Sequence, residues 1–459
     1  MTDLAKAPDV ITNRYLSGLY APVTEEVTAF DLAVTGTLPA ELDGRYLRNG
    51  PNPLAAPDPA KYHWFTGDAM VHGISLRDGK AEWYRNRWVR STEVSEALGE
   101  EPAPGERHGG MDTANTNVID IGGRTHAIVE AGARPVELTD ELETVGHSDL
   151  GGTLPHGFSA HPKRDPATGE LHTISYHWAR PNVLEYTVIA TDGRVRHCVD
   201  IAVPGNPMAH DCSITESSMV VYDLPVTFDL DTAMGGGVFP YIWDPGYGAR
   251  VGVLPLAGSP DDVVWFEIEP CYVFHPLNAR DEGETVVLDV VRHPRMFDNN
   301  RLGPNDGVPT LWRWTLDRST GKATEHQLDD RAVEFPRVDE RVVGRAHRYG
   351  WATGLGVGTD DDIDFPGASM VRYDSATGDA EVVSFGPGRS AGEVVFVPRA
   401  ADAAEDDGWY LTLVHDAAED KTDLVVLDAG APTEAPVATV HLPARVPLGF
   451  HGNWLATAR

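Results

Sequence analysis

The sequence predicts an all-β fold, and more narrowly a β-propeller of about seven blades. Short apolar runs rich in β-branched or aromatic residues recur along the chain, for example at 184–189, 285–291 and 311–316. Tight turns separate these runs, and helical signals are scarce. The length of 459 residues fits seven blades at roughly 60 residues each. No Ser-, Pro- or Gly-rich linker divides the chain, which favours one large ring over several sandwich domains.

The turns indicate β-hairpins. A longer turn with an Asp at its start and a Gly near its end occurs three times, and the Asp can cap the turn while the Gly takes the left-handed conformation. Shorter turns with Gly in a two-residue loop have the chemistry of tight hairpins. The longer turns begin at Asp165, Asp317 and Asp374, and the shorter ones contain Gly79, Gly123 and Gly193.

We interpret residues 1–459 as a single propeller domain. Residues 1–60 are rich in proline, and we expect this segment to wrap the outside of the ring or to close it.

Composition narrows the range of functions. The net charge of −33 repels phosphate backbones, so nucleic acid is not expected as a partner. The same charge disfavours binding to anionic lipid through a basic patch. No apolar run reaches the length of a membrane span, and the N-terminus lacks the features of a signal peptide. We therefore expect a cytoplasmic protein, and its three cysteines, without a CxxC pair, fit a reducing compartment.

Four of the eighteen histidines occur in distinctive settings: His161, His210, His275 and His451. Each follows small or apolar residues at the edge of a strand-like run. The first three lie roughly one blade length apart, and the last follows after about three blade lengths, as expected for ligands from several blades facing one axis. His451 lies close to the C-terminus among glycine, proline and aromatic residues, which indicates a tail that is fixed in place. Spacing alone does not exclude His156, His172 and His177.

Four imidazoles without a thiolate suit iron, copper, zinc or nickel. The second ring nitrogen of a metal-bound histidine usually donates to a carboxylate. Glu130, Glu334 and Glu393 are candidates because each is flanked by apolar residues, although an exposed position on an alternating strand explains them equally well.

Ten motifs in order give the chain a family resemblance from about Asn13 to its end. The chain resembles the carotenoid cleavage oxygenases, non-haem iron enzymes that split conjugated carbon–carbon double bonds with O2. The motifs are Arg48-Asn-Gly-Pro-Asn-Pro, His63-Trp-Phe-Thr-Gly-Asp-Ala-Met-Val-His, Ala114-Asn-Thr-Asn, Glu130, Ala160-His-Pro-Lys, Ala209-His-Asp, Phe274-His-Pro-Leu-Asn-Ala, Glu334-Phe-Pro, the stretch from Glu393 to Pro398, and Gly449-Phe-His-Gly.

The resemblance implies a seven-bladed β-propeller with short helices and loops capping one face over the metal site. It implies Fe(2+) held by His161, His210, His275 and His451, with Glu130, Glu334 and Glu393 bonded to three of them. Thr116 matches a position beside a vacant iron site in relatives. The implied reaction joins an apolar conjugated substrate with O2 to give two carbonyl products, and no catalytic residue beyond the metal centre is required.

The substrate is predicted to be a carotenoid or apocarotenoid, with a stilbene or phenylpropanoid alkene as the alternative. In the stilbene-cleaving branch a Lys precedes the first of the three glutamates, and here that residue is Val129. An apolar tunnel is expected to carry the substrate. Its candidate lining residues are Phe65, Trp88, Tyr241, Trp243 and Phe297.

Two other classes of function compete with this prediction. A lactonase-like propeller hydrolase would hold a divalent metal mainly through carboxylate and amide oxygens. A non-catalytic propeller would serve as a binding module and hold no metal. At most a weak peripheral membrane contact is expected, and the sequence does not predict an oligomeric state.

Overall fold

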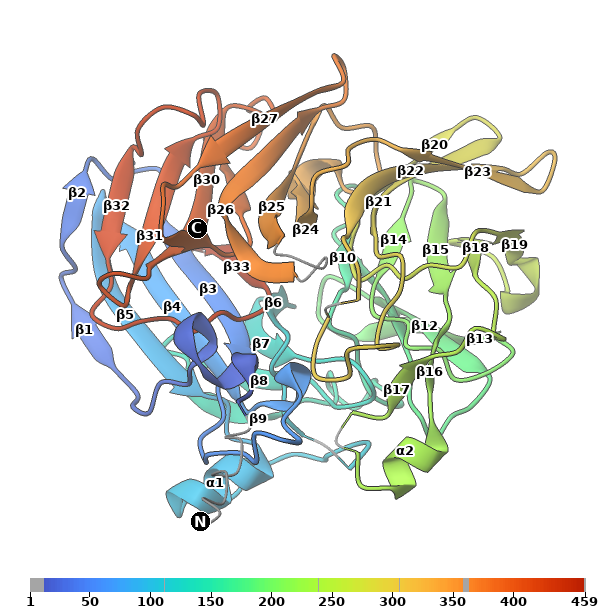
Figure 1. The fold of residues 1–459 in the computed structure, drawn as a ribbon, viewed down its shortest axis with the longest axis horizontal. Coiled ribbons are helices and arrows are strands. Elements are labelled where there is room, and N and C mark those ends of the chain that lie inside the picture. Colours follow the sequence, from blue (N-terminus) through green and yellow to red (C-terminus); the bar gives the residue numbers. More distant parts are fainter. Residues whose placement is uncertain (1–11, 111, 238, 305, 358–362, 458–459) are drawn as a thin grey trace, which may run out of the picture.

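The strands form a ring of seven antiparallel sheets, which confirms the predicted propeller (Figure 1). The computed structural model describes residues 12–110, 112–237, 239–304, 306–357 and 363–457. Within them, most sheets have four strands in chain order, and a short hairpin stands apart from the ring. This hairpin consists of β16 (Val226–Phe228) and β17 (Tyr241–Trp243).

Five sheets follow one another along the chain. The first is β6 (Asn117–Ile121), β7 (Arg124–Ile128), β8 (Val136–Leu138) and β9 (Thr144–His147). The second is β10 (Lys163–Arg164), β11 (Leu171–Ser175), β12 (Val183–Ile189) and β13 (Val195–Ala202). The third is β14 (Cys212–Ile214), β15 (Ser218–Asp223), β18 (Arg250–Pro255) and β19 (Val264–Glu267). The fourth is β20 (Pro276–Glu282), β21 (Thr285–Arg292), β22 (Thr310–Asp317) and β23 (Lys322–Gln327). The fifth is β24 (Val333–Val338), β25 (Tyr349–Val357), β26 (Ile363–Asp374) and β27 (Asp379–Ser384).

Two sheets combine the ends of the chain. One contains β2 (Val34–Gly36), β28 (Arg389–Ala391), β29 (Val395–Pro398), β30 (Gly408–Asp416), β31 (Lys421–Asp428) and β32 (Ala438–His441). The other contains β1 (Thr28–Phe30), β3 (Gly44–Pro51), β4 (Ala69–Arg77), β5 (Lys80–Trp88) and β33 (Gly452–Ala456).

The ring is closed by pairing strands from opposite ends of the sequence. The last strand, β33, pairs with β3, and β2 pairs with β32. Figure 1 shows the same closure as blue N-terminal strands beside red C-terminal ones. The extent of the closing segment, residues 1–60, and the single-domain organisation stay predictions, since residues 1–11 lie outside the described part of the chain.

The six predicted turns all join neighbouring antiparallel strands. In the three long turns, the N–H groups of Gly169, Gly321 and Gly378 donate to the carbonyls of the starting Asp residues, each at 2.8 Å. These glycines have φ values of 75°, 69° and 78°, which side chains other than glycine rarely adopt. The repeated turn chemistry of the sequence therefore marks real hairpins.

Burial follows the position of a strand within its blade. Inner and middle strands such as β14 and β15 are buried throughout, whereas the outer strand β23 is largely exposed. Apolar side chains fill the spaces between adjacent sheets, and the largest such cluster joins the sheets from β11 to β22. Packing between blades therefore holds the inner strand ends, which carry the site, at fixed positions.

Helices are few and short, as the sequence predicts. Among the described residues they comprise α1 (Thr92–Leu98), α2 (Leu230–Met234) and the 3-10 turns η1 (Arg14–Leu16), η2 (Gly18–Tyr20), η3 (Trp64–Thr66), η4 (Pro260–Asp262) and η5 (Glu340–Val342). No helix in the described part of the chain is long and apolar enough to cross a membrane. Cytoplasmic localisation stays a prediction.

Removing the closing strand should destabilise the protein. Deletion of residues 452–459 removes β33 and its pairing with Gly44 to Arg48. At about 1 kcal/mol for each lost backbone hydrogen bond, we expect the free energy of unfolding to fall by about 4–5 kcal/mol. Denaturant titration followed by tryptophan fluorescence measures this change. Deletion of residues 458–459, beyond β33, is the control, and equal midpoints for the two truncations would contradict the proposed closure.

Candidate metal centre

Each of the four predicted histidines lies one or two residues before the innermost strand of a blade. His161 precedes β10, His210 precedes β14, His275 precedes β20 and His451 precedes β33. The blades surround one axis, so the starts of their inner strands converge there. All four side chains are buried.

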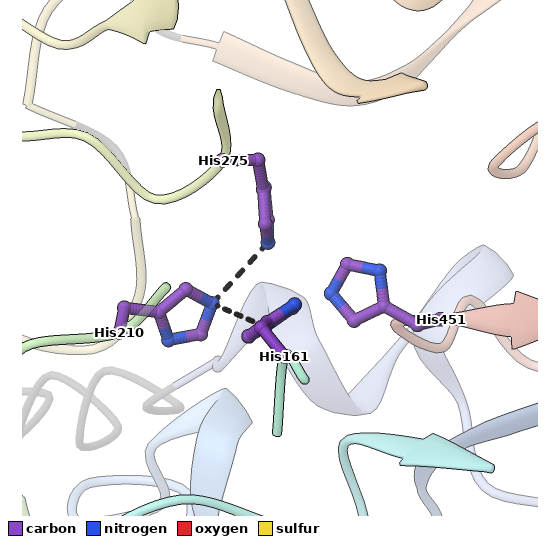
Figure 2. A group of neighbouring side chains, drawn as sticks. All are labelled: His161, His210, His275 and His451. Carbon is purple, nitrogen blue, oxygen red and sulfur yellow. Dashed lines mark hydrogen bonds between the residues drawn. The ribbon is translucent and has the colours of Figure 1, made fainter. Parts of the chain in front are cut away.

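The four imidazoles point toward one another (Figure 2). One ring nitrogen from each lies within 4.8 Å of the others. The Nε2 atoms of His161 and His210 are 3.0 Å apart, and those of His210 and His275 are 3.2 Å apart. A metal about 2.1 Å from two nitrogens at a right angle places those nitrogens about 3.0 Å apart, so the spacing fits a metal ion.

Three glutamates contact the Nδ1 atoms of three of the rings, on the side away from the centre of the cluster. Nδ1 of His210 is 2.8 Å from Glu130, Nδ1 of His275 is 2.5 Å from Glu334, and Nδ1 of His451 is 2.9 Å from Glu393. A carboxylate accepts a hydrogen bond, so each Nδ1 carries the proton and each Nε2 carries a lone pair that faces inward.

This arrangement suits a metal cation at its centre. When His210 and His275 are neutral and donate through Nδ1, their facing Nε2 atoms at 3.2 Å direct two lone pairs toward one point, as metal ligands do. Burial lowers the pKa of His451 to about 3 and that of His161 well below 6.5, which keeps both rings neutral. Neutral imidazoles with inward lone pairs are ligands for a transition metal.

Electrostatics also fixes the charge of the glutamates. Burial alone would raise the pKa of Glu334, but His275 and His293 hold it below its usual range. For Glu393, burial is likewise outweighed, first by the guanidinium of Arg337 at 3.2 Å and then by His451. Burial opposes protonation of His275, yet the Glu334 carboxylate raises the pKa of this ring above 6.5. The carboxylates of Glu334 and Glu393 are therefore ionised acceptors.

The fourth histidine has a different partner, which the sequence analysis did not assign. Nδ1 of His161 lies 3.7 Å from Asp211, beyond hydrogen-bond distance, and Asp211 bonds to Lys163 at 2.8 Å. Burial raises the pKa of Asp211. Asp211 directly follows His210 in the sequence, and this adjacency to a predicted ligand could have identified it.

Unusual backbone conformations turn two of the glutamates toward the centre. Ala131, directly after Glu130, has φ 61°, and Phe335, directly after Glu334, has φ 53°. Non-glycine residues in this region are strained, and such strain persists where surrounding structure enforces it. The N–H of Phe335 also donates to the Glu334 carboxylate.

An apolar cavity of about 430 Å³ reaches the histidines from one side. His210, His275 and His451 line it, as do Thr116, Phe65 and Tyr241. Its outer part is formed by η3, α2 and the loops beside them, which is the predicted capping over the site. Thr116 bonds through Oγ1 to Asn115, and its role beside an open metal position stays a prediction.

Three of the five tunnel candidates do not line this cavity. Trp88 packs on Met70 and Val94 and donates Nε1–H to the carbonyl of Asn52. Trp243 is buried in the hairpin opposite Val226. Phe297 stands behind the cavity wall, with its ring 4.8 Å from that of Phe239. Trp88 therefore packs in a separate cluster, whereas Trp243 and Phe297 pack in the same cluster as Tyr241 and Phe274 of the cavity wall without lining the cavity themselves.

Other aromatic residues take the places of these candidates. Phe274, Phe335 and Phe450 line the cavity, and each is adjacent in sequence to a histidine or glutamate of the centre. That adjacency could have identified them. Phe239 and Trp178 also line the cavity, and the sequence carried no comparable signal for them.

The three histidines left open by spacing lie away from the centre. His172 bonds to the hydroxyl of Tyr186 at 2.8 Å, and His156 bonds to Glu185 at 2.5 Å. His177 lies beside His108, with a ring separation of 5.6 Å. Among the described residues, the group placed to hold a metal is the set of four predicted histidines.

The fold and the cluster define a propeller with a buried four-histidine metal site. Known proteins match it over nearly its whole length. The family model described as retinal pigment epithelial membrane protein matches residues 20–456. The carotenoid cleavage oxygenase of Mycobacterium tuberculosis is 49% identical, covering 97% of this chain and 98% of that one. This chain belongs to the carotenoid cleavage oxygenase family.

Solved structures agree with this assignment. The lignostilbene dioxygenase of Pseudomonas brassicacearum superposes with a TM-score of 0.86 at 29% identity, covering 97% of this chain and 99% of that one. A cobalt-substituted Synechocystis apocarotenoid oxygenase gives a TM-score of 0.85 at 27% identity, covering 95% of this chain and 97% of that one.

Removing the charge of one supporting glutamate should weaken metal binding. Glu393→Gln leaves Arg337 and Arg48 without their shared carboxylate and loosens the orientation of His451. We expect a loss of about 10–100-fold in affinity for Co²⁺, measured by titration of the metal-free protein. Glu185→Gln is the matched control, because Glu185 is equally buried and bonds to His156 and Arg180 outside the centre. Equal affinities in both variants would contradict this role for Glu393.

Proposed function

We propose that this protein is an Fe(2+)-dependent dioxygenase that cleaves one conjugated double bond of a carotenoid or apocarotenoid. The observation that carries the proposal is the meeting of the histidine cluster with the apolar cavity, because three of the four histidines form part of the cavity wall. A substrate in the cavity would lie directly against the metal. Family membership supports the reaction class.

The reaction balances without another reductant. The carbon–carbon double bond breaks, each of its carbons takes one atom of O2, and the alkene supplies the electrons that reduce O2. Iron, when bound, supplies the activation of O2. A neutral set of imidazoles favours Fe(2+) over Fe(3+), because neutral ligands do not offset the additional positive charge of Fe(3+).

The protein's own residues hold, orient and enclose the reactants. Glu130, Glu334 and Glu393 fix the rings of His210, His275 and His451. The aromatic walls bind a flat polyene through apolar contact and exclude water. No proton transfer is needed for this balance, so no acid or base residue is assigned.

The lining favours an apolar substrate over a phenolic one. Among the described residues no Lys, Arg or Asp lines the cavity, and its glutamates, Glu130 and Glu334, are already bonded to histidines. Val129 lines the cavity at the position where the family resemblance implies a Lys in stilbene-cleaving enzymes. Leu230 and Met234 at the cavity are 61% and 80% exposed, so apolar surface continues from the interior to solvent.

A stilbene or phenylpropanoid alkene is the second candidate substrate. The structural likeness to a lignostilbene dioxygenase favours it, as does the phenol of Tyr241 in the cavity wall. A hydrolase is less well supported, because calcium prefers oxygen ligands and the converging atoms here are imidazole nitrogens. A binding module without a metal does not account for the facing lone pairs.

Metal removal should abolish the activity. We expect chelation to stop cleavage, Fe(2+) to restore it, and labelled O2 to place one oxygen atom in each product, measured by mass spectrometry. His275→Ala should lose most of its iron, because one of four ligands is gone. His172→Ala, which removes a buried histidine outside the cluster, should keep it. Full activity of metal-free protein would refute the proposal.

A cation in the cavity should change substrate preference. Val129→Lys places an ammonium where a phenolate would meet it, and such a charged hydrogen bond contributes about 1.5 kcal/mol. We expect the ratio of kcat/KM for a hydroxystilbene to that for an apocarotenal to rise about tenfold, with Val129→Met as the uncharged control. If the unaltered protein already prefers the hydroxystilbene, the second candidate substrate is the correct one.

A further inference from the structure

A second cavity also reaches the histidines, and it differs from the first in volume and in the polarity of its lining residues. It has a volume of about 760 Å³ and is lined by residues of β6, β10, β14, β20, β24 and β33, the inner strands around the axis. His161, His275 and His451 line it. We call it the axial channel.

The axial channel and the apolar cavity approach the metal centre from opposite sides. Phe274 and Phe450, which precede His275 and His451, line the apolar cavity. The residues that follow the same histidines, such as Pro276 and Asn453, line the axial channel. His161 lines the channel alone, and His210 lines the cavity alone. The histidine layer therefore separates two compartments.

The two compartments suit different reactants. The channel wall is rich in charged side chains, with seven carboxylates against five Lys and Arg side chains. These run from Glu141 at the exposed outer part to Asp211, which is buried beside His161. A hydrated divalent cation loses much solvation energy in an apolar space, whereas charged and polar walls replace its water. The net charge of −33 also attracts cations to the protein.

We propose that the axial channel is the path by which a divalent metal ion reaches and leaves the four histidines. The apolar cavity is thereby reserved for the substrate. This inference rests on the metal site of the proposed function. It assigns a role to the channel carboxylates other than Glu393, because Glu393 already orients His451.

The path can be tested by changing the charge of the channel without touching the centre. Glu141 and Arg77 are exposed residues of its wall. Stopped-flow absorbance follows Co²⁺ uptake by the metal-free full-length protein. At low ionic strength we expect Glu141→Lys to slow the second-order uptake rate about three- to tenfold and Arg77→Glu to accelerate it. Both differences should shrink at high salt, where charges are screened. The final Co²⁺ stoichiometry should not change.

Two control variants make the test specific. Asp402→Lys reverses an exposed charge that lines neither compartment and should leave the uptake rate unaltered. Ala233→Trp narrows the apolar cavity at α2 and should also leave it unaltered. Slower uptake in Ala233→Trp, or equal rates in the two channel variants, would overturn the axial path. Failure of the unaltered protein to bind Co²⁺ or Fe²⁺ at all would instead refute the proposed function.

Discussion

The structure depends on one constraint, which is that four imidazoles must face one another inside a buried space. The Nε2 atoms of His210 and His275 are 3.2 Å apart, and lone pairs that face one another at this distance repel unless a cation lies between them. Without rigid support the rings would turn away or take up protons. The carboxylates behind them prevent both changes, because an ionised acceptor on Nδ1 fixes the tautomer and the orientation of the ring.

The supporting carboxylates need partners of their own, and Glu393 and Glu334 receive them from different groups. Arg337 neutralises Glu393 and also donates to the carbonyl of Gly452 in the closing strand. His293 donates to Glu334. Buried charges are tolerated only with such partners. The Arg337 contacts link metal binding to ring closure, because one guanidinium holds both the acceptor of His451 and the strand that follows this histidine.

Much of this arrangement could be predicted from the sequence. Turn chemistry identified the hairpins, since Asp and Gly at set positions act through local backbone geometry. The histidines could be sorted because each stands at the start of a strand. The cavity wall was harder to predict, since Trp88 packs in a separate cluster, and Trp243 and Phe297 pack beside the wall without lining it. The face on which an aromatic side chain emerges depends on contacts distant in sequence. The strain at Ala131 and Phe335 had no local signal either, because neither residue type favours positive φ.

The position of the histidines at the boundary between two compartments resolves a conflict in the chemistry. An apolar polyene binds best between aromatic walls that exclude water. A divalent metal ion needs polar groups along its path, so one pocket does not suit both. A propeller provides two faces to one axial layer, since residues before each inner strand open to one side and residues along the strand open to the other. His275 and His451 line both compartments. The metal can therefore enter from the polar axial channel and contact a substrate in the apolar cavity, because the imidazoles lie between the two.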